Sequence, residues 1–114
     1  MFATFLLAAL LTANTISVTD GDTIRIGDER IRVMGLDAPE LRGKCREERR
    51  LAVRAKDALS RELSSGSIDI QRHGLDKYRR TLARVYVNGR DVAEVLINMG
   101  LARPYEGGKR AGWC

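Results

Sequence analysis

Four acidic side chains and an arginine lie close together in the early part of the chain. Asp22 follows Asp20 in the run Asp-Gly-Asp-Thr, while Asp37 and Glu40 share the run Asp-Ala-Pro-Glu, and Arg32 stands between the two runs. Carboxylates beside tight turns supply the oxygen ligands that hard divalent cations prefer, and the planar fork of an arginine pairs with phosphate. These residue types therefore predict a cation site next to a phosphate site.

The elements around these residues must bring them to one place. Alternating apolar and polar residues predict three opening strands, over residues 16–18, 23–26 and 30–34. A two-residue turn at Gly27-Asp28 sets Ile24 opposite Ile31. The same turn carries the Asp22 end of one strand back beside Arg32, so the acids and the arginine are expected at one end of the sheet.

The rest of the chain predicts two helices and two further strands. Apolar residues at spacings of three and four predict an amphipathic helix over 47–64, whose charged start at 46–50 is expected to be solvated. Strands are expected over 67–72 and 81–87, a short helix from Asp91 to Gly100, and a last extended piece over 101–105. The predicted fold class is mainly β with α (α+β): a five-stranded, partly open Greek-key barrel of the oligonucleotide-binding (OB) kind, with one inserted helix and a second short helix.

The first residues form an apolar leader. Residues 1–19 carry no charged side chain, and the apolar run at 2–13 suits a signal peptide but is too short to span a bilayer. We expect residues 1–13 to be a signal peptide and the protein to be secreted or periplasmic, with no stable membrane partner after processing. No basic residue precedes the run, so a membrane anchor or a cytoplasmic protein stays open. The domain proper is expected over 14–105, and a monomer is the default.

Charge and cysteines add two further expectations. Twenty Lys and Arg against 15 acids give a net charge of +5, which favours a polyanionic partner such as nucleic acid. Cys45 and Cys114 form a disulfide if the protein is exported, or remain free thiols in the cytosol.

Residues 106–114, the C-terminal tail, are rich in glycine and basic residues and are expected to be loosely held.

Four short motifs follow one another along the chain: Asp20–Thr23, Arg32–Glu40, Asp76–Arg80 with Leu82-Ala83 after it, and Gly100–Ala102. In this order they resemble the staphylococcal nuclease (thermonuclease) family, from about Val18 to Tyr105. The resemblance implies a calcium-dependent endonuclease on an OB-fold. Such an enzyme hydrolyses phosphodiester bonds of DNA and RNA and leaves 3′-phosphate ends.

The resemblance also implies a role for each matching residue. The calcium ligands would be Asp22, Asp37 and the backbone carbonyl of Ala38. The catalytic group would be Glu40 as general base with Arg32 and Arg80 on the scissile phosphate, and the nucleic acid would contact Lys77, Tyr78 and Tyr105. These roles agree with the chemistry, since displacement at phosphorus builds negative charge that guanidiniums and a metal stabilise.

One residue departs from the pattern of the family. Arg79 stands where glycine is usual before the arginine that matches Arg80, and glycine would permit a backbone angle that an arginine does not adopt cheaply. The aim of Arg80 therefore depends on how this loop is built. The alternative function is a noncatalytic nucleic-acid-binding OB-fold module, which gives no reason for the catalytic acids and arginines to occur together.

Overall fold

The computed structural model of the chain describes residues 15–114. The expected leader at 1–13 lies outside this range, so its identity stays a prediction. Among residues 15–114, no helix combines the length and the apolar character needed to cross a membrane.

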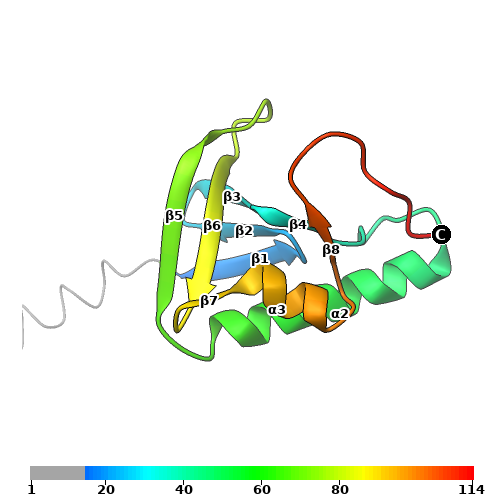
Figure 1. The fold of residues 1–114 in the computed structure, drawn as a ribbon, viewed down its shortest axis with the longest axis horizontal. Helices are drawn as coiled ribbons and strands as arrows, with labels where there is room; N and C mark the ends of the chain where they lie inside the picture. The colour runs from blue at the N-terminus through cyan, green and yellow to red at the C-terminus, as the bar shows by residue number, and fades with distance from the viewer. Residues whose placement is uncertain (1–14) are drawn as a thin grey trace, which may run out of the picture.

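The main sheet is built from the strands that the sequence predicts. Its order is β1-β2-β3-β6-β5, with the short β7 (Arg90–Asp91) beside β6 (Figure 1). The five long strands are β1 (Ile16–Asp20), β2 (Thr23–Ile26), β3 (Glu29–Val33), β5 (Ile68–Leu75) and β6 (Thr81–Val87). The register sets Ile24 opposite Ile31 and Thr23 opposite Arg32, which confirms the turn at Gly27-Asp28. Among the strand pairs of this sheet within residues 15–114, only β3–β6 is parallel.

A second, two-stranded sheet carries one of the acids. In it β4 (Gly35–Asp37) pairs antiparallel with β8 (Arg103–Tyr105), so Asp37 lies opposite Arg103. The extended piece predicted at 101–105 thus has its partner next to the acidic turn. Within residues 15–114 no ladder joins β1 to β5, so the strands do not close into a complete barrel.

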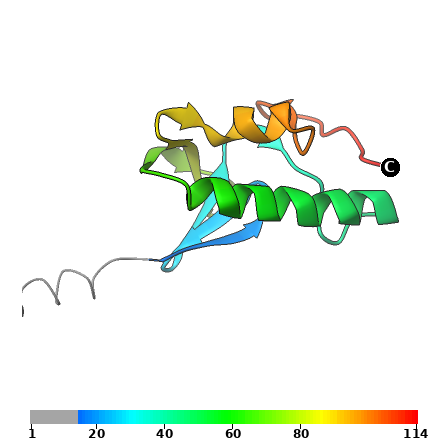
Figure 2. The same cartoon turned by 90° about the horizontal axis from the view of Figure 1, so that it is seen from below.

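In the described part of the chain, two helices complete the α+β fold that the sequence predicts. Helix α2 (Arg46–Leu63) runs along one side of the sheet, and α3 (Val92–Asn98) lies beside it (Figure 2). The side chain of Asp91 caps α3 by accepting a hydrogen bond from the amide of Ala93 at 2.9 Å. The two helices and the sheet share one core, which includes Ile24, Ile31, Val33, Ala55, Leu59, Val85 and Leu96.

Gly21, in the turn between β1 and β2, marks a close approach of three segments. A Cβ atom at this position would lie 2.7 Å from the Cβ of Ala38 and 2.8 Å from the Cβ of Ala55. The turn before Asp22 is therefore packed between the acidic loop and helix α2. This packing sets the position of Asp22 relative to Asp37.

Candidate active site

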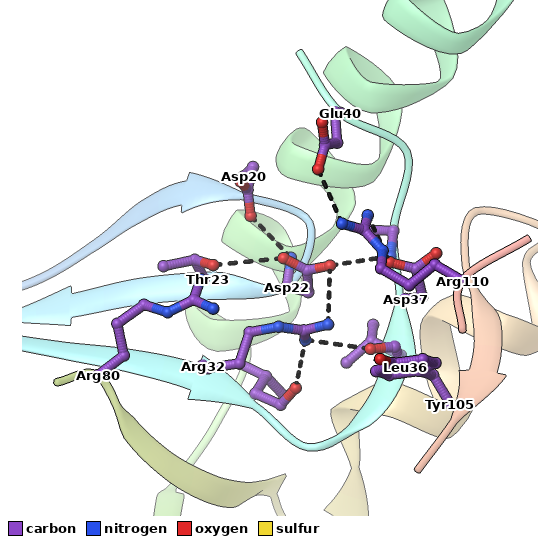
Figure 3. A network of polar contacts seen from close by, with 12 residues as sticks. Asp20, Asp22, Thr23, Arg32, Leu36, Asp37, Glu40, Arg80, Tyr105 and Arg110 are labelled. Atoms are coloured by element: carbon purple, nitrogen blue, oxygen red, sulfur yellow. Dashed lines mark hydrogen bonds and ion pairs between the residues drawn. The ribbon is translucent and has the colours of Figure 1, made fainter. Parts of the chain in front are cut away.

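Two buried carboxylates form the centre of the site (Figure 3). Asp22 is 8 % exposed and Asp37 only 3 %. The amide of Ala38 donates to Oδ2 of Asp22 at 2.9 Å, and the amide of Val33 donates to the carbonyl of Asp22 at the same distance. These two bonds join the β1–β2 turn to the loop that carries Asp37 and Glu40, as the sequence predicts.

The surroundings of Asp22 disfavour its charged form. Burial raises the pKa of Asp22 to about 6, against the effect of Arg32, whose Nη2 lies 3.5 Å from Oδ2. Asp20 adds a second negative charge nearby, and its Oδ1 accepts a hydrogen bond from the amide of Asp22 at 3.1 Å. Asp22 therefore carries a negative charge that Arg32 compensates only in part.

Asp37 and Glu40 both face the guanidinium of Arg110. Nη2 of Arg110 lies 2.7 Å from Oδ1 of Asp37, and Nη1 donates to Oε1 of Glu40 at 2.9 Å. Burial lowers the pKa of Arg110, but its contacts with Glu40 and Asp37 outweigh burial and raise it, so the guanidinium stays charged. Oδ1 of Asp37 is buried and accepts no well-aligned hydrogen bond. This buried oxygen is met by the ion pair with Arg110 and lies near the carboxylate of Asp22. Two buried carboxylates at one place are a donor set that fits a hard divalent cation.

Arg32 is held rigidly at the end of β3. Its Nη1 donates to the carbonyl of Val33 at 2.7 Å and to the carbonyl of Leu36 at 3.1 Å. The side chain is only 13 % exposed, and its Cζ lies 6.0 Å from the ring centre of Tyr105. These contacts fix the guanidinium next to Asp22.

Arg80 is oriented by Asp76 across the loop between β5 and β6. Oδ1 of Asp76 accepts from the amides of Tyr78 and Arg80, each at 2.9 Å, and Oδ2 accepts from Nε of Arg80 at 2.8 Å. Burial raises the pKa of Asp76, but these hydrogen bonds outweigh it, and the pKa is lowered. Arg79 has a φ of +63°, so it adopts the left-handed conformation that glycine would adopt more easily. The loop is built without the glycine, and Asp76 sets the direction of Arg80.

A cleft of about 470 Å³ collects the residues expected to meet a substrate. It is lined by Arg32, Asp76, Lys77, Tyr78, Arg80, Tyr105 and Arg110, among others. In the view of Figure 3, Arg32 lies between Arg80 and Arg110. The structure thus brings both predicted phosphate-binding arginines and all three predicted substrate-contacting residues to one cleft beside Asp22 and Asp37.

The hydroxyl of Tyr105 has a further contact, because it donates to the carbonyl of Gly108 in the C-terminal tail at 2.6 Å. Arg103 donates to the carbonyl of Gly112 at 2.5 Å. The bond between Cys45 and Cys114 fixes the end of the tail to the start of α2. The tail is therefore held at several points, and the expectation of a loosely held segment is wrong.

Two residues of the site are not predicted from the sequence. Glu48 was expected in a solvated helix start, and this is wrong, since the residue is 7 % exposed. Its Oε2 accepts from the amide of Glu40 and its Oε1 from the amide of Lys44, both at 3.1 Å. A glutamate at the third helical position is a signal for such a contact. Arg110 gives no signal of its own. From the sequence, a bridge between Cys45 and Cys114 is expected to pin the tail over the barrel if it forms, but no residue of the tail is predicted to enter the site.

Comparison with known proteins identifies the family. The model of the staphylococcal nuclease homologue family matches residues 30–111, which hold Arg32, Asp37, Glu40 and Arg80. The chain belongs to this family. The resemblance drawn from the four motifs is confirmed.

Curated proteins with related sequences carry different names. The chain is 27 % identical over 100 residues to an "Uncharacterized endonuclease" of Haemophilus influenzae, an alignment of 83 % of this chain and 53 % of the relative. It is 35 % identical over 86 residues to the "Probable endonuclease lcl3" of Emericella nidulans, covering 67 % of this chain and 31 % of the relative. It is also 37 % identical over 92 residues to the "Succinoglycan biosynthesis protein ExoI" of Rhizobium meliloti, covering 75 % and 48 %. The chain spans about half, or less, of the length of these relatives.

Proposed function

We propose that this staphylococcal nuclease homologue is a calcium-dependent endonuclease. It hydrolyses phosphodiester bonds of DNA, RNA or both and leaves 3′-phosphate ends. The observation that carries the proposal is the convergence of Arg32 and Arg80 in one cleft, next to the buried carboxylates of Asp22 and Asp37. Two relatives with endonuclease names give independent support for a nuclease.

The cation would be held by Asp22, Asp37 and the carbonyl of Ala38. Support comes from the burial of both carboxylates and from the raised pKa of Asp22, which a bound cation would lower. When bound, calcium would supply positive charge toward the nonbridging oxygens of the substrate phosphate.

The two arginines would bind the scissile phosphate. A guanidinium pairs with two phosphate oxygens at once, and its attraction grows as negative charge builds on them during displacement. Both arginines are already oriented, Arg32 by backbone carbonyls and Arg80 by Asp76, so little reorganisation is needed when substrate enters. The contacts to the rest of the nucleic acid would come from Lys77, Tyr78 and Tyr105. Tyr78 is 59 % exposed, which suits a ring that stacks on a base.

Glu40 would act as the general base. Its side chain is 56 % exposed, so a water molecule can reach it, and its backbone is fixed by Glu48. Glu40 takes a proton from the attacking water while the water oxygen forms a bond to phosphorus. The bond from phosphorus to the 5′ oxygen breaks, and that oxygen takes up a proton. The products are a 3′-phosphate and a 5′-hydroxyl.

Nucleic acid is the proposed partner, and secretion or a periplasmic location is the proposed setting. The disulfide between Cys45 and Cys114 supports an oxidising compartment. A mass measurement of the protein under nonreducing conditions, after expression with its leader, tests both the bridge and the processing at residues 1–13. Free thiols in the exported form would contradict this setting.

The test of activity uses the purified chain with circular plasmid DNA and with RNA, in calcium and then in a chelator. We expect cutting in calcium only, and new 5′ ends that a polynucleotide kinase labels without prior phosphatase treatment. A matched control is Arg25→Ala, which removes an exposed guanidinium of β2 outside the cleft and should leave cutting unchanged, whereas Arg32→Ala should abolish it. Binding without cutting would support the noncatalytic module instead.

A further inference from the structure

The C-terminal tail carries one guanidinium into the cleft. Arg110 lies between two points at which the tail is anchored, Gly108 and Gly112, and the tail ends at the start of α2 (Figure 1). Next to the second anchor, the ring of Trp113 lies 3.8 Å from Cζ of Arg103. The position of Arg110 is thus fixed by the fold around it.

Arg110 is the most accessible of the three arginines that line the cleft. Its side chain is 42 % exposed, against 25 % for Arg80 and 13 % for Arg32. Arg32 is held by two backbone carbonyls, with Asp22 as a further partner at 3.5 Å, and Arg80 is held by Asp76, which is not a candidate ligand or base. The partners of Arg110 are instead Asp37 and Glu40. Arg110 therefore has both the exposed surface and the replaceable partners that binding another anion requires.

The charges of the site indicate which kind of anion Arg110 would bind. The argument rests on the proposed function, in which a divalent cation binds Asp37. The guanidinium of Arg110 would be repelled by a cation held at Asp37, which would compensate the charge that this guanidinium now compensates. The guanidinium then faces the same cleft as Arg32 and Arg80, where the anion to be bound is a phosphate of the nucleic acid.

We propose that Arg110 is a third phosphate-binding arginine of the active site, brought there by the disulfide-bonded tail. Without substrate it pairs with Asp37 and Glu40. With cation and nucleic acid present it contacts the phosphate backbone in the cleft.

The first test is the rate of hydrolysis of a single-stranded oligonucleotide in calcium. We expect Arg110→Ala to lower kcat/KM by roughly 100-fold. Removal of one hydrogen-bond donor to the negative charge of a transition state has an effect of this size in other enzymes. Arg110→Lys should recover part of the loss, because it keeps the charge without the planar fork. The control is Lys109→Ala, which removes the same charge from the neighbouring position outside the cleft and should change kcat/KM by less than about threefold. Equal effects of Arg110→Ala and Lys109→Ala would overturn the proposal.

The second test measures binding instead of turnover. In the Glu40→Gln background, the affinity for a fluorescent single-stranded DNA is followed by anisotropy in calcium over a series of salt concentrations. Adding Arg110→Ala should reduce the slope of log affinity against log salt by about 0.7, the value for one phosphate contact on a single strand. Adding Lys109→Ala should leave the slope nearly unchanged. Equal slopes in the two variants would contradict a direct contact of Arg110 with phosphate.

The third test concerns the tether. Cys114→Ser removes the bridge at an exposed position, and it should lower kcat/KM in the same direction as Arg110→Ala. Combined with Arg110→Ala it should cause no further loss. Normal activity of Cys114→Ser would overturn the role of the bridge. If the unaltered chain neither binds nor cuts nucleic acid, the proposed function fails and this proposal with it. If the chain cuts normally and only the Arg110 variants are unaffected, this proposal alone fails.

Discussion

Glu48, in the first turn of α2, accepts a hydrogen bond from the backbone amide of Glu40 at 3.1 Å. Its other carboxylate oxygen accepts from the amide of Lys44 at the same distance, so one buried side chain closes the loop between the acidic turn and the helix. Gly43 makes room for this arrangement, since a Cβ there would lie 2.3 Å from Cδ of Glu48. The loop that carries the proposed base is thus fixed by hydrogen bonds to a buried side chain of α2.

Glu48→Ala is expected to lower kcat with little change in KM, because it releases the backbone of Glu40 without removing a group that contacts substrate. It should also cost about 2 kcal/mol in the free energy of unfolding, as two amides lose a charged acceptor. Glu48→Gln keeps one acceptor oxygen. Its kcat and its free energy of unfolding should lie between those of the unaltered chain and those of Glu48→Ala. The control is Glu47→Ala in the same turn, where the side chain is exposed. If Glu48→Ala and Glu47→Ala changed kcat to the same extent, a positioning role of Glu48 would be ruled out.

Glu40→Gln is expected to reduce the rate of phosphodiester cleavage by about 10² to 10⁴-fold, the usual range for loss of a general base. The amide keeps the size of the side chain but does not take up a proton. Melting temperature and DNA affinity should change little, since Glu40 is largely exposed. Steady-state kinetics of the variant and of the exposed control Glu47→Gln measure this. Near-normal turnover would remove Glu40 from the reaction.

Asp22→Asn is expected to stabilise the protein at neutral pH in a chelator while abolishing calcium-dependent cutting. The pKa of Asp22 is about 6 in the folded chain against 3.8 for an ordinary aspartate, so folding favours the protonated form. The Asp22 carboxyl therefore makes its full contribution to the free energy of unfolding below about pH 4, and this contribution is lost as the pH rises to about 6. The amide side chain of the Asp22→Asn variant does not ionise and so does not lose this contribution. At pH 7 the variant should therefore have a free energy of unfolding higher by on the order of 2 kcal/mol.

The measurement is urea unfolding of both proteins between pH 4 and pH 8. The difference in unfolding free energy should be small at the acid end and grow up to about pH 6, with no further change above it. Asp57→Asn, on the exposed face of α2, is the control for the loss of a carboxylate outside the site. A difference that does not depend on pH would mean that the pKa of Asp22 is not raised.

Gly21→Ala is expected to destabilise the protein by about 1–3 kcal/mol, because the added methyl group overlaps Ala38 and Ala55. The overlap should also move Asp22 away from Asp37 and weaken calcium binding. Gly112→Ala adds a methyl group in open space and serves as the control. Denaturation curves and calcium titrations of the two variants test the prediction, and equal stabilities would show that the close approach at Gly21 relaxes freely.

Arg79→Gly is expected to raise the free energy of unfolding by up to about 1 kcal/mol. It relieves the left-handed backbone conformation at φ +63°, although the greater freedom of glycine in the unfolded chain offsets part of the gain. Asn88→Gly is the contrasting variant. Asn88 has a φ of +50°, but its side chain accepts a hydrogen bond from the amide of Ser67, so the loss should destabilise. Thermal unfolding of both variants decides the point, and a destabilised Arg79→Gly would show that the arginine side chain stabilises the loop.

The parts of this molecule that sequence predicts are those set by local pattern. The Gly27-Asp28 turn fixes the register of β2 and β3, and this register alone brings Asp22 beside Arg32. Helix α3 begins where Asp91 caps it. In each case the residues that decide the outcome are neighbours in the chain.

The parts that sequence did not predict depend on contacts between distant segments. Glu48 is buried because the loop at 40–44 folds back on it, and Arg110 reaches Glu40 from 70 residues further along the chain. Neither contact leaves a periodic pattern in the sequence. The backbone angle of Arg79 was anticipated as costly, but the compensation by Asp76 depends on its reaching three donor groups at once.

The bridge between Cys45 and Cys114 closes a ring of chain that contains α2, β5, β6 and α3. The sulfur–sulfur bond forms only where an oxidant is present. Completion of the cleft is therefore tied to the redox chemistry of the compartment. In a thiol-rich compartment the same domain would fold around its core without this covalent tether. Arg110 would then be held opposite Asp37 only by its ion pairs and by the hydrogen bonds at Gly108 and Gly112.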